Sequence, residues 1–304
     1  MRHQTTLRFI DAIARAGSIR RAAEKMAITP SALNRRLLAV EEEFDAQLFE
    51  RMATGVRLSA AGELFLAHAR RQMADMDRVR SQIEDMKGAR RGHVAFGFDD
   101  GLVMEGFSEA ISLYRNDHPD VTFSIERVER NDVQQSLSDY RIDLAGVVQP
   151  EAFPNITTLA VAPLTVSAIM RADHPLADCR TVTFNDVLPH PLVLPMSGSL
   201  RNLLDVAARR QDYELRPVLE CELPMASHTL ANSTAIGFIA DIGTDIGGQI
   251  EIPLDNMIAI PLDVRDLKPP NLHLVQLRGR ALSVASGRFA DMLVQRFARY
   301  SGEI

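Results

Sequence analysis

The sequence lacks the features of several large protein classes. No apolar run reaches the roughly 18 residues that a membrane-spanning helix needs, and Met1-Arg-His-Gln leads straight into an amphipathic segment rather than a signal peptide. Only two cysteines are present, Cys179 and Cys221, and they lack metal-ligand spacing. They indicate free thiols in a reducing cytoplasm, with a regulatory disulfide as the alternative.

Motifs for catalysis and for metal or cofactor binding are also missing. The sequence contains no H-E-x-x-H, C-x-x-C, G-x-G-x-x-G or G-x-x-x-x-G-K-S/T motif, and its eight histidines are scattered. The segment from Gly243 to Gly248 is rich in glycine but lacks the lysine of a phosphate-binding loop, so we predict a surface loop there. We therefore expect no enzymatic activity, no metal site and no cofactor.

The charge is divided unevenly along the chain. The 304 residues are 46% hydrophobic and carry a net charge of −6, which describes a globular chain with material for two or three cores. Residues 1–91 hold 17 Lys/Arg against 12 Asp/Glu, a net of +5, and residues 92–304 hold 17 against 28, a net of −11. A basic N-terminal part on an acidic body is typical of a DNA-binding domain joined to a domain that stays off DNA.

The stretch from Ser18 to Leu37 has the pattern of a helix-turn-helix. Ser18 can cap a short helix that runs to Met26, and Thr29-Pro30 can open a second helix, because serine and threonine favour the cap position and proline the first helical position. Polar side chains near the start of the second helix point outward, as in a DNA reader: Ser31, Asn34, Arg35 and Arg36. On the turn alone, an αα-hairpin with a solvated charged face is the alternative.

One motif within this stretch and two downstream of it decide between these readings. Ala32-Leu-x-Arg35, Leu48-Phe-Glu-Arg51 and Arg57-Leu-Ser-x-Ala-Gly62 follow in the order and spacing of LysR-type transcriptional regulators, which the first ninety or so residues resemble closely. The remainder resembles the family mostly in layout, and Arg171 to Ala177 looks like a stretch that the family often carries. The family usually has Ser-Gln-Pro where this chain has Thr29-Pro30-Ser31, so its base-reading glutamine is absent here.

A short two-stranded wing is expected from Phe49 to Ser59, with a turn at Thr54-Gly55. We predict that Ser31, Asn34 and Arg35 read base edges and that Thr29, Arg51 and Arg57 hold the DNA backbone. The full predicted DNA-binding set is Ser18, Arg21, Thr29, Ser31, Asn34, Arg35, Arg36, Arg51 and Arg57.

A long helix from Ala60 to about Lys87 follows the wing. At 1.5 Å per residue it spans roughly 40 Å, which is long for a helix without a partner. Apolar residues fall close to a heptad seam and predict a two-stranded coiled coil, with packing on the helix's own domain as the alternative. The predicted dimerisation residues are Phe65, Ala69, Met73 (or Gln72), Met76, Val79, Ile83 and Met86.

From His93 onward, strand and helix patterns alternate, which predicts a parallel α/β layer. A second α/β set begins with a strand at Leu164 to Arg171, and a last helix near Ala285 to Tyr300 returns to the first set. The expected fold is α/β and multi-domain, with a winged helix-turn-helix at 1–60, a linker helix at 61–90 and a two-lobed effector domain at 91–304, similar to periplasmic binding proteins. We place lobe I at about 91–163 and 267–304 and lobe II at about 164–266.

An effector is expected between the lobes, where strands end and helices begin. The candidate residues are Asp99, Asp100, Ser197, Ser199, Arg201 and Thr229, the last at a presumed helix entrance. Family members commonly have Ser or Thr where this chain has Asp99 and Asp100, often placed to hold a carboxylate. Asp99 and Asp100 would repel an anion, so we predict an effector with an amine or several hydroxyls; a purely N-capping role for these aspartates is the alternative.

Together these patterns predict a cytoplasmic, ligand-responsive DNA-binding regulator. The expected partners are double-stranded DNA, a small-molecule effector, further copies of the chain in a dimer or tetramer, and RNA polymerase, with no membrane. The alternative from another class is a solute-binding or metabolic α/β protein whose N-terminal helices serve only for dimerisation.

Overall fold

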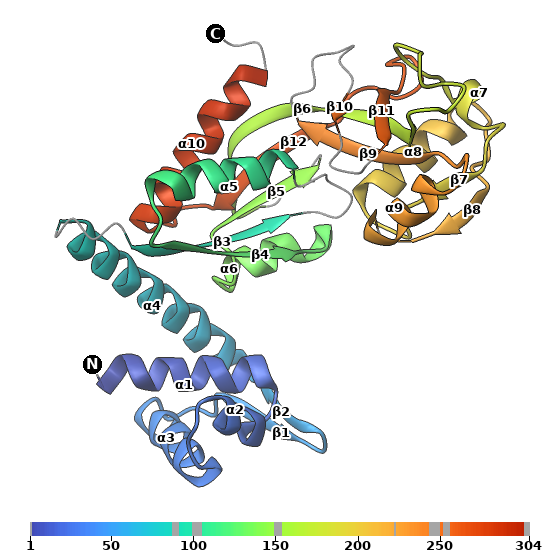
Figure 1. Cartoon of the computed structure of the whole chain (residues 1–304). Helices are drawn as coiled ribbons and strands as arrows, with labels where there is room; N and C mark the ends of the chain where they lie inside the picture. The colour runs from blue at the N-terminus through green and yellow to red at the C-terminus, as the bar shows by residue number, and fades with distance from the viewer. Residues whose placement is uncertain are drawn as a thin grey trace. The chain divides into compact units, whose positions relative to one another are not determined.

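The computed structural model describes residues 2–86, 91–98, 105–148, 154–221, 223–242, 250–251 and 256–300. The chain divides into two compact units, one containing α1 to α4 with strands β1 and β2 and the short segment Ser138–Arg141, and the other containing the remaining residues from β3 to α10. Figure 1 shows the elements of each unit in chain order. Asp99 and Asp100 lie outside the described residues.

The first unit is a winged helix-turn-helix, as expected. Helices α1 (Arg2–Ala16), α2 (Ile19–Lys25) and α3 (Pro30–Glu43) are followed by the antiparallel strands β1 (Phe49–Met52) and β2 (Gly55–Leu58). The helices share one apolar core, in which Ile10, Ile13 and Leu33 are almost fully buried. The apolar spacing read from the sequence therefore faces this core.

Helix α4 (Ala60–Met86) spans 27 residues. Its first turns pack on the helix-turn-helix, where Leu66 joins the core and Phe65 meets Phe44 edge to face at 5.2 Å. Further along, large apolar side chains are exposed, among them Ile83 at 46% and Met86 at 87%. The first turns of α4 are therefore packed against the helix-turn-helix, whereas its later turns expose a stripe of apolar side chains.

The second unit is built on one continuous sheet that serves two lobes. In lobe I, β3 (Gly92–Phe98) pairs in parallel with β4 (Val121–Arg127) and β5 (Leu144–Val148), and β12 (Asn271–Leu277) joins β5 antiparallel. Helices α5 (Glu105–Asp117) and α10 (Val284–Tyr300) cover one face and α6 (Val133–Ser138), preceded by the 3-10 turn η1 (Arg130–Asp132), covers the other (Figure 1). Aromatic rings from three elements meet in this core: Phe96, Phe107 and Phe289.

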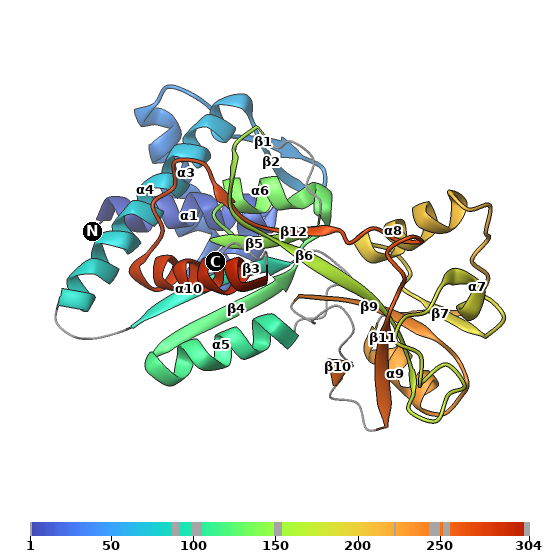
Figure 2. The same cartoon turned by 90° about the horizontal axis from the view of Figure 1, so that it is seen from above.

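Strand β6 (Ile156–Arg171) passes from one lobe to the other (Figure 2). Its half up to Pro163 pairs with β12, and its half from Leu164 pairs with β9 (Gly237–Ile242) and β11 (Met257–Pro261). The short strand β10 (Ile250–Glu251) adds to the β11 edge. The pairing partners of β6 change at the Pro163–Leu164 junction, so a single strand links the two lobes.

Lobe II is completed by short elements on both faces of this half-sheet. Strands β7 (Leu192–Leu194) and β8 (Pro217–Glu220) pair in parallel. Helices α7 (Phe184–Val187) and α8 (Ser199–Arg209) pack into the large core that also contains lobe I residues, and α9 (Leu223–Ala231) packs on the opposite face.

Several sequence-based boundaries in lobe II were wrong. The strand expected to begin at Leu164 begins at Ile156, and the sequence reading missed β11, β10 and α7. Helix α9 begins at Leu223, so Thr229 lies near its end and not at a helix entrance. In the described part of the chain, no helix is both long and apolar enough to cross a membrane.

Candidate nucleic-acid interface and effector site

The N-terminus of α3 is built by a side-chain cap. Thr29 accepts the backbone N–H of Ala32 at 3.2 Å and lies 3.2 Å from the hydroxyl of Ser31, while Pro30 occupies the first helical position. Ser31 and Arg35, one turn apart, are exposed, and Asn34 beside them is half-buried. The structure thus brings the three predicted base readers together on one face of α3.

Arg36 takes a different direction from the other predicted DNA-binding residues on α3. Its guanidinium lies over the ring of Phe9 on α1, 4.8 Å from the ring centroid. A cation over an aromatic face is attracted by the ring's electron distribution. Arg36 is exposed, as expected, so its predicted DNA-binding role stays a prediction, and the same side chain joins α3 to α1 through this contact.

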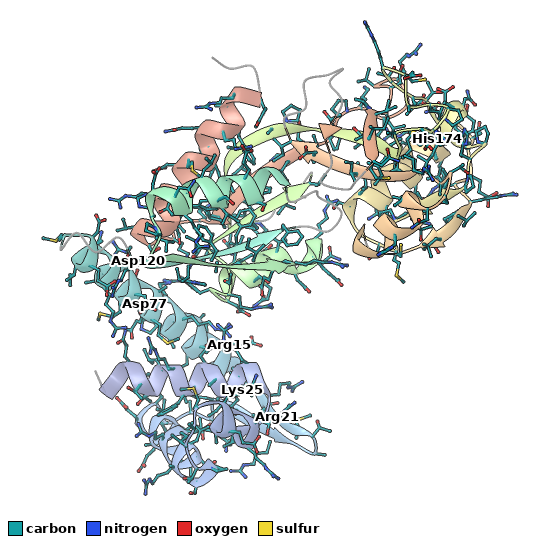
Figure 3. All side chains as sticks on the ribbon, in the orientation of Figure 1. Arg15, Arg21, Lys25, Asp77, Asp120 and His174 are labelled. Atoms are coloured by element: carbon teal, nitrogen blue, oxygen red, sulfur yellow. The ribbon has the colours of Figure 1, made fainter. Side chains whose placement is uncertain are left out.

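Helix α2 contributes cations next to α3. Ser18 caps α2 and accepts the backbone N–H of Arg21 at 3.5 Å. Arg21 and Lys25 are one turn apart, and the side chain of Arg21 is exposed; Figure 3 labels both on this unit. Lys25 is not among the residues predicted from the sequence to bind DNA, although its spacing of four residues from Arg21 places the two on one helix face.

The wing carries one paired and one unpaired arginine. Glu50 and Arg57 are cross-strand neighbours, and their side chains form an exposed ion pair at 2.7 Å. The hydrogen bond that Arg57 donates to Glu50 raises the pKa of Arg57 above its ordinary value. Arg51 is exposed, and the ion pairs found among the described residues do not include it. Arg51 is consequently the freer cation for a phosphate.

Three hydrogen bonds, two of them through the side-chain hydroxyl of Ser59, hold the wing to the turn after α1, to the segment before β1 and to α4. The N–H of Val56 donates to the carbonyl of Gly17 at 3.0 Å, and Ser59 both donates to the Gln47 carbonyl at 2.5 Å and accepts the N–H of Gly62 at 3.0 Å. A Cβ on Gly62 would stand 2.0 Å from the carbonyl oxygen of Leu48. The Arg57-Leu-Ser-x-Ala-Gly62 motif therefore encodes the close approach of α4 to the wing.

The predicted dimerisation seam divides into two parts. Ala69 is fully buried within the chain, so its assignment to the seam is corrected, whereas Phe65 is half-buried against the core of its own unit and stays a predicted seam residue. Met73 is half-buried. The remaining seam residues are exposed by 40% or more and form what we call the α4 stripe: Met76, Val79, Ile83 and Met86.

Arg201 on α8 makes four hydrogen bonds within lobe II through its Nε and Nη1 atoms. Its guanidinium Nε donates to both carboxylate oxygens of Asp205, at 3.1 and 3.0 Å, and Nη1 donates to the Pro195 carbonyl at 2.9 Å and to Glu220. The bonds to Glu220 and Asp205 raise the pKa of Arg201. One cation between two carboxylates leaves this cluster net negative, and Arg201 ties the loop after β7 to α8 and β8.

The other candidate effector residues are less constrained. Ser197 is exposed in the loop before α8, and Ser199 is buried as the first residue of α8. Thr229 is half-buried, and its carbonyl accepts the hydroxyl of Ser233 at 2.6 Å in the last turn of α9. The described residues contain no group of three or more His, Cys, Asp or Glu side chains that could hold a metal ion.

Comparison with known proteins finds matches to one protein family in both units. Residues 5–63 match the bacterial regulatory helix-turn-helix proteins of the lysR family, and residues 87–298 match the LysR substrate binding domain. Among curated relatives, the transcriptional dual regulator GltC of Bacillus subtilis is 29% identical over 277 residues, covering 88% of this chain and 89% of GltC. A probable nitrogen assimilation transcriptional activator of Synechocystis sp. is 25% identical over 218 residues, covering 70% of each chain.

Solved structures share the fold along almost the whole chain. Full-length CbnR in complex with its target DNA has a TM-score of 0.62 at 17% identity, covering 97% of this chain and 99% of CbnR. A full-length OxyR variant from Pseudomonas aeruginosa has a TM-score of 0.65 at 18% identity, covering 98% and 95%. At this identity the likeness concerns the fold.

Proposed function

The chain belongs to the LysR family and is therefore a DNA-binding transcriptional regulator with an effector-binding domain, and not an enzyme. We propose that it binds a pseudo-palindromic operator as a dimer or tetramer. Family membership also decides against a solute-binding or metabolic protein that uses its N-terminal helices only to dimerise. We keep residues 1–60, 61–90 and 91–304 as the proposed boundaries of the three functional parts.

The face of α3 with Ser31, Asn34 and Arg35 carries the proposal. Asparagine is suited to adenine and arginine to guanine in the major groove. Thr29, Ser18 and Arg21 lie at the starts of α3 and α2, where hydroxyl and cationic groups can meet phosphates, and Arg51 and Arg57 extend this role to the wing. Of these two, Arg51 is the stronger candidate, because Arg57 is paired with Glu50.

The α4 stripe supports dimerisation. Four large apolar side chains at heptad spacing are exposed in the single chain, and burying them against a second α4 removes that surface from water. Two edge strands of the second unit also present apolar side chains, Ile125 on β4 at 40% and Val218 on β8 at 66% exposure, which favours further contacts between copies in a tetramer.

The effector proposal rests on the charge around Arg201. Because Asp205 and Glu220 already occupy this guanidinium, it is a poor counter-ion for a free carboxylate. We infer an effector that carries an amine or several hydroxyls and binds between the lobes near Ser197 and Ser199. Its binding energy must couple reciprocally to that of DNA. As a DNA-bound regulator, the protein acts in the cytoplasm and meets RNA polymerase there.

Selection of bound sequences from a random duplex library, at two salt concentrations, tests the DNA proposal. We expect enrichment of a pseudo-palindrome whose half-sites lie one or more helical turns apart, with affinity falling steeply as salt rises. Arg35→Ala should abolish the preference at its base position while retaining non-specific binding. Arg216→Ala removes an exposed arginine from the effector domain and serves as the control. Absence of any enrichment at low salt would contradict sequence-specific reading.

A further inference from the structure

Glu41 links the recognition helix to the wing by two hydrogen bonds. It lies in the last turn of α3, and its Oε1 accepts the backbone N–H groups of Leu48 at 2.7 Å and Phe49 at 3.2 Å. Leu48 is 1% and Phe49 6% exposed, so water has little access to these donors. A buried N–H without a partner is costly, and a carboxylate is a strong acceptor for it.

These bonds act where the wing begins. Phe49 is the first residue of β1, and Arg51 follows two residues later on the same strand. The contacts at Gly17 and Gly62 attach the wing to the turn before α2 and to α4, whereas Glu41 attaches it to α3 itself. The carboxylate therefore fixes the start of the strand bearing Arg51 relative to the helix bearing Ser31, Asn34 and Arg35.

A structural role of Glu41 and a purely electrostatic effect of its charge predict opposite changes in DNA affinity when the side chain is removed. An acidic side chain close to DNA repels phosphates, so its removal should strengthen binding on Coulombic grounds alone. Glu42 and Glu43 follow on the same helix and are exposed to solvent. They offer the same charge at nearly the same place without the bonds to β1.

We propose that Glu41 is a positioning residue for DNA recognition: it holds the wing so that Arg51 meets a phosphate in register with the bases read by α3. This inference rests on the DNA contacts proposed above. Loss of the acceptor oxygen leaves the base readers in place but loosens the start of β1, so the phosphate contact of Arg51 is lost although the arginine is still present.

The experiment measures the affinity of the full-length protein for a duplex carrying the selected site and for a duplex of random sequence, over a series of salt concentrations. The variants are Glu41→Ala, Glu41→Asp, Glu41→Gln, Arg51→Ala and the double variant Glu41→Ala/Arg51→Ala, with Glu42→Ala as the matched control. Glu41→Asp keeps the charge but shortens the side chain by one methylene group, and Glu41→Gln keeps the acceptor oxygen but removes the charge.

We expect Arg51→Ala to weaken binding roughly tenfold, as for a lost hydrogen bond to a charged group, and to reduce the salt slope by about one. Glu41→Ala and Glu41→Asp should weaken binding by a similar factor, and the double variant should be no weaker than Arg51→Ala alone. Glu41→Gln should stay close to the unaltered protein, and Glu42→Ala should bind equally well or more tightly.

Tighter binding by Glu41→Ala, or losses that simply multiply in the double variant, would overturn the inference. If Glu41→Ala does not fold, Glu41→Asp decides, because its effect on DNA affinity cannot come from a change in charge. If Arg51→Ala binds normally, the proposed wing contact itself is wrong and this inference fails with it; if Arg51→Ala weakens binding but Glu41→Asp does not, only the role of Glu41 is refuted.

Discussion

Replacing Ile83 with aspartate should dissociate the proposed dimer. Ile83 lies in the α4 stripe with Met76, Val79 and Met86, and 46% of its surface is exposed in the single chain. Full burial of an isoleucine side chain is worth about 1.5–3 kcal/mol, so covering the exposed part contributes roughly 1 kcal/mol per chain. Both chains of a symmetric dimer bury one Ile83, so the total contribution is about 2 kcal/mol per dimer.

The loss of about 2 kcal/mol per dimer raises the dissociation constant by roughly 30-fold. Two aspartates facing each other across the axis add desolvation and repulsion, so this factor is a lower bound. Sedimentation velocity of the full-length protein over a concentration series measures the dissociation constant directly.

Leu64→Asp provides the matched control. Leu64 is also on α4 and is more exposed, at 78%, but it lies outside the heptad seam. Its substitution should leave the dissociation constant unchanged. Equal behaviour of the Ile83→Asp and Leu64→Asp variants would refute the assignment of the stripe as the dimer contact.

Three further substitutions test the structure at single positions. In a denaturant titration, Gly62→Ala should lower the free energy of unfolding of the first unit by about 1–3 kcal/mol, because its Cβ would stand 2.0 Å from the Leu48 carbonyl. Gly287→Ala on α10 is the control: no atom of the described residues lies within 4 Å of the added methyl group, so this variant should be neutral or stabilising in the same titration. Arg36→Met should cost about 0.5–1 kcal/mol of stability through the lost contact with Phe9, and its salt slope for DNA should equal that of the unaltered protein; a reduced slope would show a phosphate contact instead. Burial, with a smaller effect of His190, lowers the pKa of His174, which Figure 3 places in lobe II. The neutral ring is therefore favoured in the fold, so lobe II should be most stable above about pH 6.5, the ordinary histidine pKa, and lose stability as the pH falls from there through the lowered pKa; His174→Gln should flatten this part of a melting-temperature profile, and an unchanged profile would contradict the assignment.

Local sequence determined the first unit almost completely. The cap at Thr29, the proline after it, the apolar spacing along α1 to α3 and the turn at Gly55 act over a few residues, so their pattern predicts their structure. The apolar side chains of the α4 stripe could be picked out for the same reason, because heptad spacing is a property of one helix, and their role in dimerisation stays a prediction. The LysR motifs then identified the unit, and the structure explains one of them through the contact of Gly62 with Leu48.

Tertiary structure decided what each of these residues meets. The direction of Arg36 depends on Phe9, the burial of Ala69 on the packing of α4, and the engagement of Arg201 on Glu220, nineteen positions away. Strand β6 pairs with β12 in its first half and with β11 in its second half, and both partners lie far along the chain, so β11 and the first half of β6 had no local signal. Periodicity reports which face of an element is apolar, but only the folded chain brings partners distant in sequence together, and those partners set whether a charged side chain is free to bind.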